Sequence, residues 1–125
     1  EIAAIVASND GTAGGAISAL KQQKLEGKVI VSGQDADLAA CQRIVEGTQA
    51  VTVYKPIQTL ASRAAEAAVA LAKGEALKDA TRTVYNGKKQ VAAILLKPIA
   101  VDKNNMMDTI IKDKFHTLEA VYKKL

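Results

Sequence analysis

Three short apolar runs decide the fold: IAAIVASN at residues 2–9, VIVSGQD at residues 29–35 and VTVYK at residues 51–55. Each run predicts a buried parallel strand, and each is followed by a segment with helical spacing. Strands that alternate with helices are typical of an α/β protein with a parallel sheet. In such a sheet, ligands bind in the crevice beyond the carboxyl ends of the strands. The sequence therefore predicts an α/β fold with a binding rim at these strand ends.

One polar side chain ends each run: Asn9, Asp35 and Lys55. An amide, a carboxylate and an ammonium can together both donate and accept hydrogen bonds. That combination suits a small polyhydroxylated ligand. The alternative is that Asn9 and Asp35 cap the following helices and that Lys55 is simply solvated. The residues alone leave both interpretations open.

Three helices are expected after the strands, over about 13–24, 36–46 and 57–73. Ile17 and Leu20 are expected on the buried side of the first helix, with Ala13 and Ala16 nearby. Asp10 or Thr12 is expected to accept from the free N–H groups at the start of the first helix. Asp37, one step into the second helix, is expected to favour only the helix dipole. Gly47 is placed to end that helix in the left-handed conformation. The third helix carries an apolar stripe from Ile57 to Ala72 that predicts packing on a sheet.

The pattern changes after residue 74. Runs at 81–85 and 91–96 flank Asn86-Gly87, which predicts a hairpin with a two-residue turn. After Pro98 the apolar run continues through 99–101. Two further helices are expected. The first covers about 106–113, with Asn104 and Asn105 as its cap and with Met106, Ile110 and Ile111 pointing inward. The second covers about 118–124 and has on one side Leu118, Val121, Tyr122 and Leu125.

The composition excludes some function classes. Of the 125 residues, 49% are hydrophobic and 24% are charged, which is ordinary for a globular domain. The net charge is +4, but the basic residues are scattered. Their densest cluster is Lys112, Lys114, Lys123 and Lys124. Because a nucleic-acid footprint requires a basic stripe, we expect no nucleic-acid partner.

Motifs for catalysis and cofactors are weak. Cys41 is the only cysteine, so no internal disulfide can form. Cys41 and His116 could be a nucleophile and a base, but Cys41 falls on a predicted buried face, and no orienting group or oxyanion site is evident. The glycines at 11–15 lack the spacing of nucleotide-binding loops. No His, Cys or Asp spacing is typical of a metal site, so neither catalysis nor a cofactor is expected.

The motifs VASNDGTAGG at residues 6–15, VSGQDAD at 31–37 and TVYKPI at 52–57 resemble those of the D-xylose-binding proteins of bacterial ABC transporters. The tail at 100–105 and 115–119 resembles them too. This resemblance implies the type I fold of periplasmic binding proteins, in which two α/β lobes enclose one sugar. It implies that Asn9, Asp35 and Lys55 contact the sugar, and these are the residues that the strand ends select.

The resemblance also implies a domain organisation. The chain corresponds to the C-terminal part of such a protein, less than half of it, and opens abruptly at Glu1. Residues 1–55 and about 98–125 would form the C-terminal lobe. Residues of about 56–97 would pack with an N-terminal lobe, which holds the family's stacking aromatic rings. Without that lobe, helix 57–73 would lose its cover, and self-association through its apolar stripe is expected.

The function that the resemblance implies is non-catalytic. The chain would bind a pentose, D-xylose above all, and deliver it to the membrane permease of an ABC transporter. Its location would be periplasmic or extracytoplasmic, as a membrane-associated lipoprotein in a Gram-positive organism. The alternative is a sugar-sensing module that presents bound xylose to a receptor kinase. Sugar-dependent association with a sensor domain would separate these two functions, and turnover of xylose would indicate an enzyme.

Overall fold

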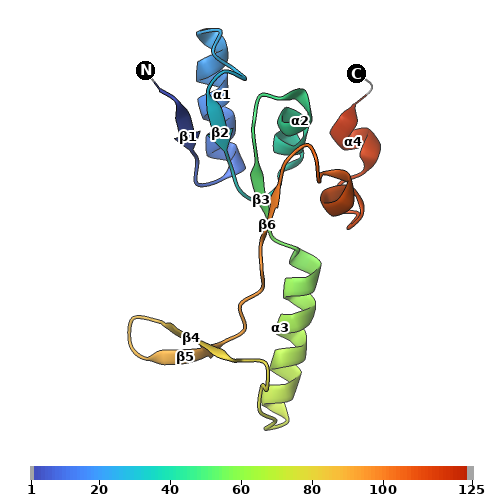
Figure 1. The fold of residues 1–125 in the computed structure, drawn as a ribbon. Helices are drawn as coiled ribbons and strands as arrows, with labels where there is room; N and C mark the ends of the chain where they lie inside the picture. Colours follow the sequence, from blue (N-terminus) through green and yellow to red (C-terminus); the bar gives the residue numbers. More distant parts are fainter. Residues whose placement is uncertain (1, 124–125) are drawn as a thin grey trace. The chain divides into compact units, whose positions relative to one another are not determined.

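The computed structural model describes residues 2–123 of the chain. The chain divides into two compact units, one formed by Glu1–Lys55 and Ile99–Leu125 and the other by Pro56–Pro98 (Figure 1). The chain's two prolines stand at the first and last positions of the second unit. Proline restricts both its own backbone and that of the preceding residue, so both boundaries fall where the chain is stiff.

A parallel sheet with one antiparallel strand forms the centre of the first unit. β1 (Ala4–Val6) pairs in parallel with β2 (Ile30–Ser32). The next strand, β3 (Thr52–Tyr54), lies parallel to the β2 segment through a bridge between Ser32 and Val51. β6 (Ile99–Val101) pairs with β3 in the antiparallel direction, with Tyr54 opposite Ile99. The three predicted strands are therefore present and parallel, although each is shorter than its apolar run.

Helix α1 (Asp10–Gln22) packs on β1 and β2 (Figure 1). Its buried apolar side chains, Ala13, Ile17 and Leu20, form one core cluster with Val29 and Val31. These helical residues recur at three- and four-residue spacing, the period of a helix with one apolar face. The buried side of this helix was predicted correctly.

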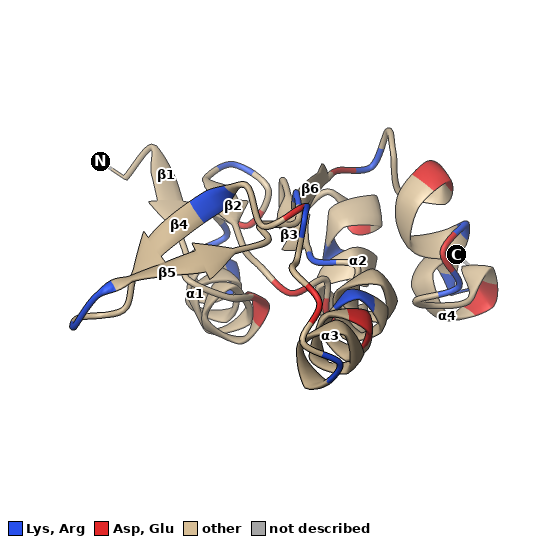
Figure 2. Cartoon of the chain, turned by 90° about the horizontal axis from the view of Figure 1, so that it is seen from below, with Lys and Arg blue, Asp and Glu red and all other residues tan. Residues whose placement is uncertain are grey.

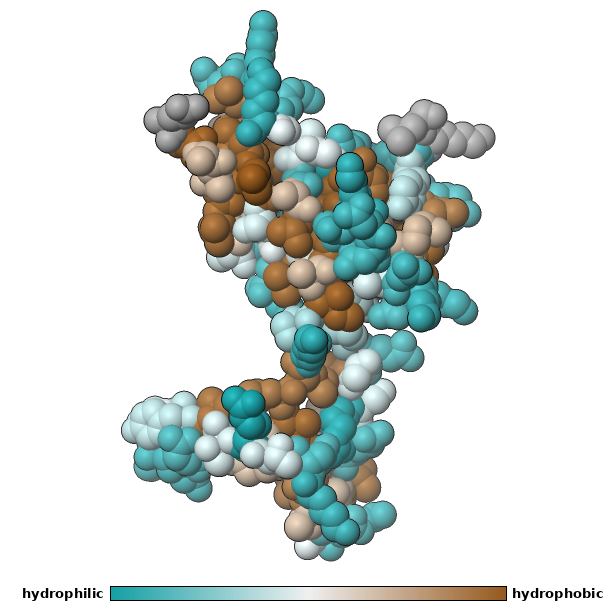
Figure 3. Space-filling view, in the orientation of Figure 1, coloured by the Kyte–Doolittle hydropathy of each residue, from teal (hydrophilic) through white to brown (hydrophobic). Residues whose placement is uncertain are grey.

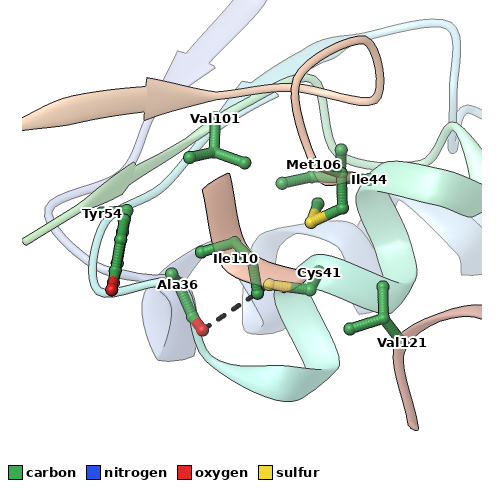
Figure 4. Close-up of a cluster of buried hydrophobic side chains, with 8 residues drawn as sticks. All are labelled: Ala36, Cys41, Ile44, Tyr54, Val101, Met106, Ile110 and Val121. Atoms are coloured by element: carbon green, nitrogen blue, oxygen red, sulfur yellow. Dashed lines mark hydrogen bonds between the residues drawn. The ribbon is translucent and has the colours of Figure 1, made fainter. Parts of the chain in front are cut away.

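A second core cluster joins segments that are distant in the sequence (Figure 4). It draws on helix α2 (Leu38–Glu46), strands β3 and β6, the π-helix η1 (Met107–Ile111) and helix α4 (Leu118–Tyr122). Cys41 and Ile44 of α2 meet Met106 and Ile110, and all four are at most 2% exposed. The inward positions predicted for Met106 and Ile110 are confirmed. This cluster holds the C-terminal segment against the end of β3, where the candidate site begins.

The outer face of β1 and β2 is apolar and open. Val6 is 91% exposed and Ile30 is 61% exposed, and brown side chains gather over this part of Figure 3. The prediction that the first two runs are buried strands is therefore wrong for these side chains. Side chains alternate between the two faces of a strand. Ile5 and Val31 point to α1, so Val6 and Ile30 point the other way, where nothing covers them within residues 2–123.

The second unit consists of helix α3 (Ile57–Ala72) and a hairpin of β4 (Arg82–Tyr85) and β5 (Gln90–Ala93). Arg63 of α3 forms ion pairs with Asp79 and with Glu66. Figure 2 colours basic residues blue and acidic residues red along the whole chain. α3 ends one residue before its predicted boundary. None of its residues is buried, although its apolar stripe predicted packing on a sheet. An apolar hollow of about 190 Å³ lies between α3 and residues of the segment from Leu77 to Leu96.

The hairpin turn differs from the prediction. Tyr85 pairs with Gln90, which leaves a loop of four residues instead of two. Asn86 Oδ1 accepts hydrogen bonds from the backbone N–H groups of Lys88 and Lys89 at 3.1 and 3.0 Å. The asparagine side chain therefore stabilises a wider loop, because it supplies an acceptor that a tight two-residue turn would not use.

The C-terminal helices also differ from the prediction. Asn104 and Asn105 do not cap a helix; their backbone N–H groups donate to Asp102 Oδ1 at 2.7 and 3.3 Å in a turn before it. The helix that follows is η1, a single π-helical segment without a side-chain cap. In α4, Val121 is buried but Leu118 is 43% exposed. Lys124 and Leu125 lie outside the described residues.

None of the helices within residues 2–123 is both long enough and apolar enough to cross a membrane.

Candidate ligand-binding rim

Asn9 follows β1 and is the N-cap of α1. Its backbone is extended, and its side-chain Oδ1 accepts a hydrogen bond from Thr12 N at 2.8 Å. Asn9 therefore accepts the capping hydrogen bond that was expected of Asp10 or Thr12. It stands at the N-cap position, from which a side-chain oxygen reaches the third N–H group of the helix. Its amide Nδ2 makes no hydrogen bond within residues 2–123, so a donor remains for a ligand. Capping and ligand binding are therefore compatible for Asn9.

Asp35 and Lys55 form an ion pair at the ends of the next two strands. Lys55 Nζ lies 2.6 Å from Asp35 Oδ1, and the two side chains are 49% and 42% exposed. A pair this exposed contributes only about 0–1 kcal/mol to stability, because water screens the attraction and the side chains lose entropy. The pair therefore does little for the fold. It places a charged donor beside a charged acceptor where a solute can reach both.

The strand ends are tied together by backbone hydrogen bonds. Asp10 N donates to Gln34 O at 2.8 Å, which joins the end of β1 to the end of β2. Asp35 N donates to Val53 O at 2.9 Å, which joins β2 to β3. The structure therefore pairs Asp35 with Lys55 directly, whereas Asn9 reaches them only through this backbone.

The backbone around Asp35 is unusual. Asp35 and Ala36 have φ values of 101° and 56°, both in the left-handed region. Residues with a Cβ adopt this region seldom and at an energetic cost, so the surrounding structure must hold them there. Asp37, which follows, is the N-cap of α2 and makes no side-chain capping bond. The expectation that Asp37 lies one step inside the helix is therefore wrong, because the left-handed turn delays the helix start.

A buried carboxylate lies directly behind this turn. Asp10 is 1% exposed. Its Oδ2 accepts from Asp37 N at 2.9 Å and from Thr52 Oγ1 at 2.8 Å, and its Oδ1 accepts from Gln49 Nε2 at 2.9 Å. Buried charges are tolerated when hydrogen bonds satisfy them, and Asp10 has three. From the sequence, Asp10 is expected only as a possible cap of the first helix.

Further donors complete this network. Arg43 donates from Nε to Gln49 Oε1 at 3.0 Å and from Nη2 to the Asp10 carbonyl at 3.1 Å. Thr52 Oγ1 also accepts from Ala36 N at 3.1 Å. Only Thr52 had a sequence signal, as a polar residue in an apolar strand. Gln49 and Arg43 had none, because their partners are distant in the sequence.

Cys41 and His116 do not form a nucleophile and base in this structure. Burial, and then the nearby carboxylates of Asp10 and Asp37, raise the pKa of the Cys41 thiol to about 11. The thiolate is the reactive form, so a buried cysteine with such a pKa is inert. His116 Nε2 is hydrogen-bonded to Ala36 O at 2.8 Å, and its ring lies against Phe115. His116 thus supports the turn from the other side.

No three His, Cys, Asp or Glu side chains come together to hold a metal ion within the described residues. The rim instead offers one carboxylate, one ammonium and one amide. Such a set recognises hydroxyl groups, because hydroxyls both donate and accept.

Comparisons with known proteins show the family of this chain. A family model described as a periplasmic binding protein domain matches residues 1–76. The chain is 61% identical, over 119 residues, to a D-xylose-binding periplasmic protein of Haemophilus influenzae, covering 95% of this chain and 36% of that protein. It is 60% identical, over 116 residues, to a D-xylose-binding periplasmic protein of Escherichia coli, covering 93% and 35%. The chain spans about a third of the length of these curated relatives.

Solved structures show the same fold. A carbohydrate transporter solute-binding protein from Chloroflexus aurantiacus, in complex with D-glucose, matches with a TM-score of 0.81 at 36% identity. That match covers 94% of this chain and 34% of the other. The predicted α/β architecture of a type I sugar-binding protein is therefore confirmed. Since the family model covers more than half of its residues, the chain belongs to the periplasmic binding protein domain family.

Proposed function

We propose that this chain is part of a binding protein that captures a pentose, D-xylose first, without catalysis. The observation that carries the proposal is the Asp35–Lys55 pair, an exposed acceptor and donor 2.6 Å apart at adjoining strand ends. Two relatives at 60–61% identity are named as D-xylose-binding periplasmic proteins. In the proposal, Asp35 accepts from sugar hydroxyls, and Lys55 and the Asn9 amide donate to sugar oxygens.

The name of a similar solved structure, a carbohydrate transporter solute-binding protein, supports a role in transport. We propose that the sugar is delivered to the permease of an ABC transporter and that the protein works outside the cytoplasm. Attachment as a lipoprotein stays a prediction. Presentation of the sugar to a receptor kinase, the alternative from the sequence, has no support in the names of these relatives. The units Glu1–Lys55 with Ile99–Leu125 and Pro56–Pro98 would belong to different lobes of the complete binding protein.

Calorimetric titration of the natural full-length protein with D-xylose, D-ribose and D-glucose tests the proposal. We expect D-xylose to bind most tightly, because a polar site rejects a ligand that leaves its buried groups unpaired. Equal affinity for ribose and xylose would contradict the selectivity. Absence of heat with all three sugars would contradict the function itself.

A further inference from the structure

We propose that Asp10 and Thr52 are positioning residues of the rim: they hold the Asp35–Ala36 turn so that the Asp35 carboxylate stands beside Lys55. This inference rests on the proposed function, because it takes Asp35 as a ligand contact. Asp10 is 1% exposed and Thr52 is fully buried. Both therefore act through the turn and not on the sugar.

The turn needs to be held. Two successive residues with a Cβ, Asp35 and Ala36, have positive φ values of 101° and 56°. Such a conformation persists only where surrounding contacts over-determine it. If the turn relaxed, the direction of the Asp35 side chain would change, and its distance of 2.6 Å to Lys55 Nζ would be lost.

Two side chains supply the contacts on the far side of the turn. Thr52 Oγ1 accepts from Ala36 N at 3.1 Å and donates to Asp10 Oδ2 at 2.8 Å. The same Asp10 oxygen accepts from Asp37 N at 2.9 Å. The N–H groups of the two residues after Asp35 are thus fixed by one hydroxyl and one carboxylate oxygen.

The network has a fixed direction, which explains why a carboxylate is needed. Gln49 Nε2 donates to Asp10 Oδ1 at 2.9 Å, while Gln49 Oε1 accepts from Arg43 Nε at 3.0 Å. Reversing the Gln49 amide would set its N–H₂ group against the Arg43 guanidinium. An asparagine at position 10 would therefore face a donor with its own donor, or leave Asp37 N without an acceptor.

Gly33 shows how closely the carboxylate fits. A Cβ at this position would overlap Asp10 Oδ1 and lie 2.7 Å from Gln49 Nε2. The glycine of the Ser32-Gly33-Gln34-Asp35 segment thus makes room for the group that holds the turn two residues later. The strand and the network have to match each other in shape as well as in hydrogen bonds.

Thr52→Val is the decisive variant, because it removes both hydrogen bonds at nearly constant volume. Thr52→Ser is its matched control, since it keeps the hydroxyl. In the natural full-length protein, titrated with D-xylose by calorimetry, we expect Thr52→Val to bind at least about tenfold more weakly and Thr52→Ser to stay within about threefold of the parent. Asp10→Asn should resemble Thr52→Val.

A stability control and a spectroscopic readout separate positioning from general destabilisation. Ile17→Val loosens the core cluster of α1, which contains no residue of the Asp35–Ala36 turn, and should leave xylose affinity unchanged. The amide shifts of Ala36 and Asp37 should move in Thr52→Val and return toward the parent values in Thr52→Ser. Equal loss of affinity in Ile17→Val and Thr52→Val would overturn the inference, as would unmoved amide shifts.

Asp35→Ala distinguishes this inference from the proposed function. If Asp35→Ala loses xylose binding and Thr52→Val does not, the positioning role is wrong and the function stands. If Asp35→Ala binds xylose as the parent does, the proposed site itself is wrong.

Discussion

Lys55 Nζ lies 2.6 Å from Asp35 Oδ1, although the whole of α2 separates the two residues in the sequence. They meet because β2 and β3 run in parallel and end at the same edge of the sheet. Crossing from one parallel strand to the next requires a helix, and the crossover returns the chain to the same edge. The pair is thus a direct product of the α/β topology, and its exposure leaves it open to a ligand.

Asp35→Ala should weaken xylose binding by the natural full-length protein far more than Asp37→Ala. Asp35 is the acceptor of the rim, and removing the partner of a sugar hydroxyl costs about 1–3 kcal/mol. The Asp37 side chain makes no capping bond, and its backbone N–H survives the substitution. Calorimetric affinities of both variants decide this, and a larger loss in Asp37→Ala would mean that the site is misplaced.

Asp102→Ala should lower thermal stability at pH 7 and have little effect in acid. Backbone N–H groups, that of Asn104 first, hold the pKa of the Asp102 carboxyl below its usual range. A lowered pKa in the folded state means that the stabilisation is present above about pH 4 and is lost as pH falls through the folded value. Unfolding midpoints from pH 7 down to pH 2 provide the measurement.

Cys41 should react slowly with a thiol-exchange reagent in the folded chain. Its pKa of about 11 leaves far less thiolate at pH 8 than an ordinary cysteine has, by a factor of about a hundred. Burial adds a barrier to access. The rate should rise sharply in urea, and a thiol introduced by Ser62→Cys on α3 should react quickly without denaturant. A fast folded-state reaction of Cys41 would contradict the burial of α2.

The 125-residue chain should self-associate through α3 at high concentration. Ile57, Leu60 and Leu71 are each more than half exposed in this helix, and exposed apolar patches find partners. Light scattering over a concentration series measures the association. Leu71→Glu should weaken it, whereas Gln58→Glu, on a polar position of α3, should not. A monomer at every concentration would contradict this prediction.

Hydrophobic periodicity predicted the helices that bury only one face. The three- and four-residue spacing of Ala13, Ile17 and Leu20 identified the buried face of α1, and Gly47, at φ 86°, ends α2 as expected. Periodicity could not predict that Val6 would be exposed. An apolar run looks the same whether its second face is covered or open, because coverage depends on other segments.

The candidate site was predictable in part. Strand ends selected Asn9, Asp35 and Lys55, and the structure places all three at one end of the sheet. The supporting residues behind them were not predictable. Asp10 looked like a cap, and its hydrogen bonds to Gln49 and Thr52 exist only once β3 lies beside β2. The left-handed turn at Asp35 was also hidden, because no glycine marks it.

The antiparallel pairing of Tyr54 with Ile99 makes the second unit an insertion. The chain leaves the first unit after β3 and returns to it at β6, on residues whose Cα atoms are about 5 Å apart. The second unit, Pro56–Pro98, therefore occupies the place of a hairpin loop in the first unit. Shortening a loop of that length to a few residues would lower its closure entropy cost by about 2 kcal/mol. The first unit thus has the connectivity of a continuous small domain into which another segment can be inserted between β3 and β6.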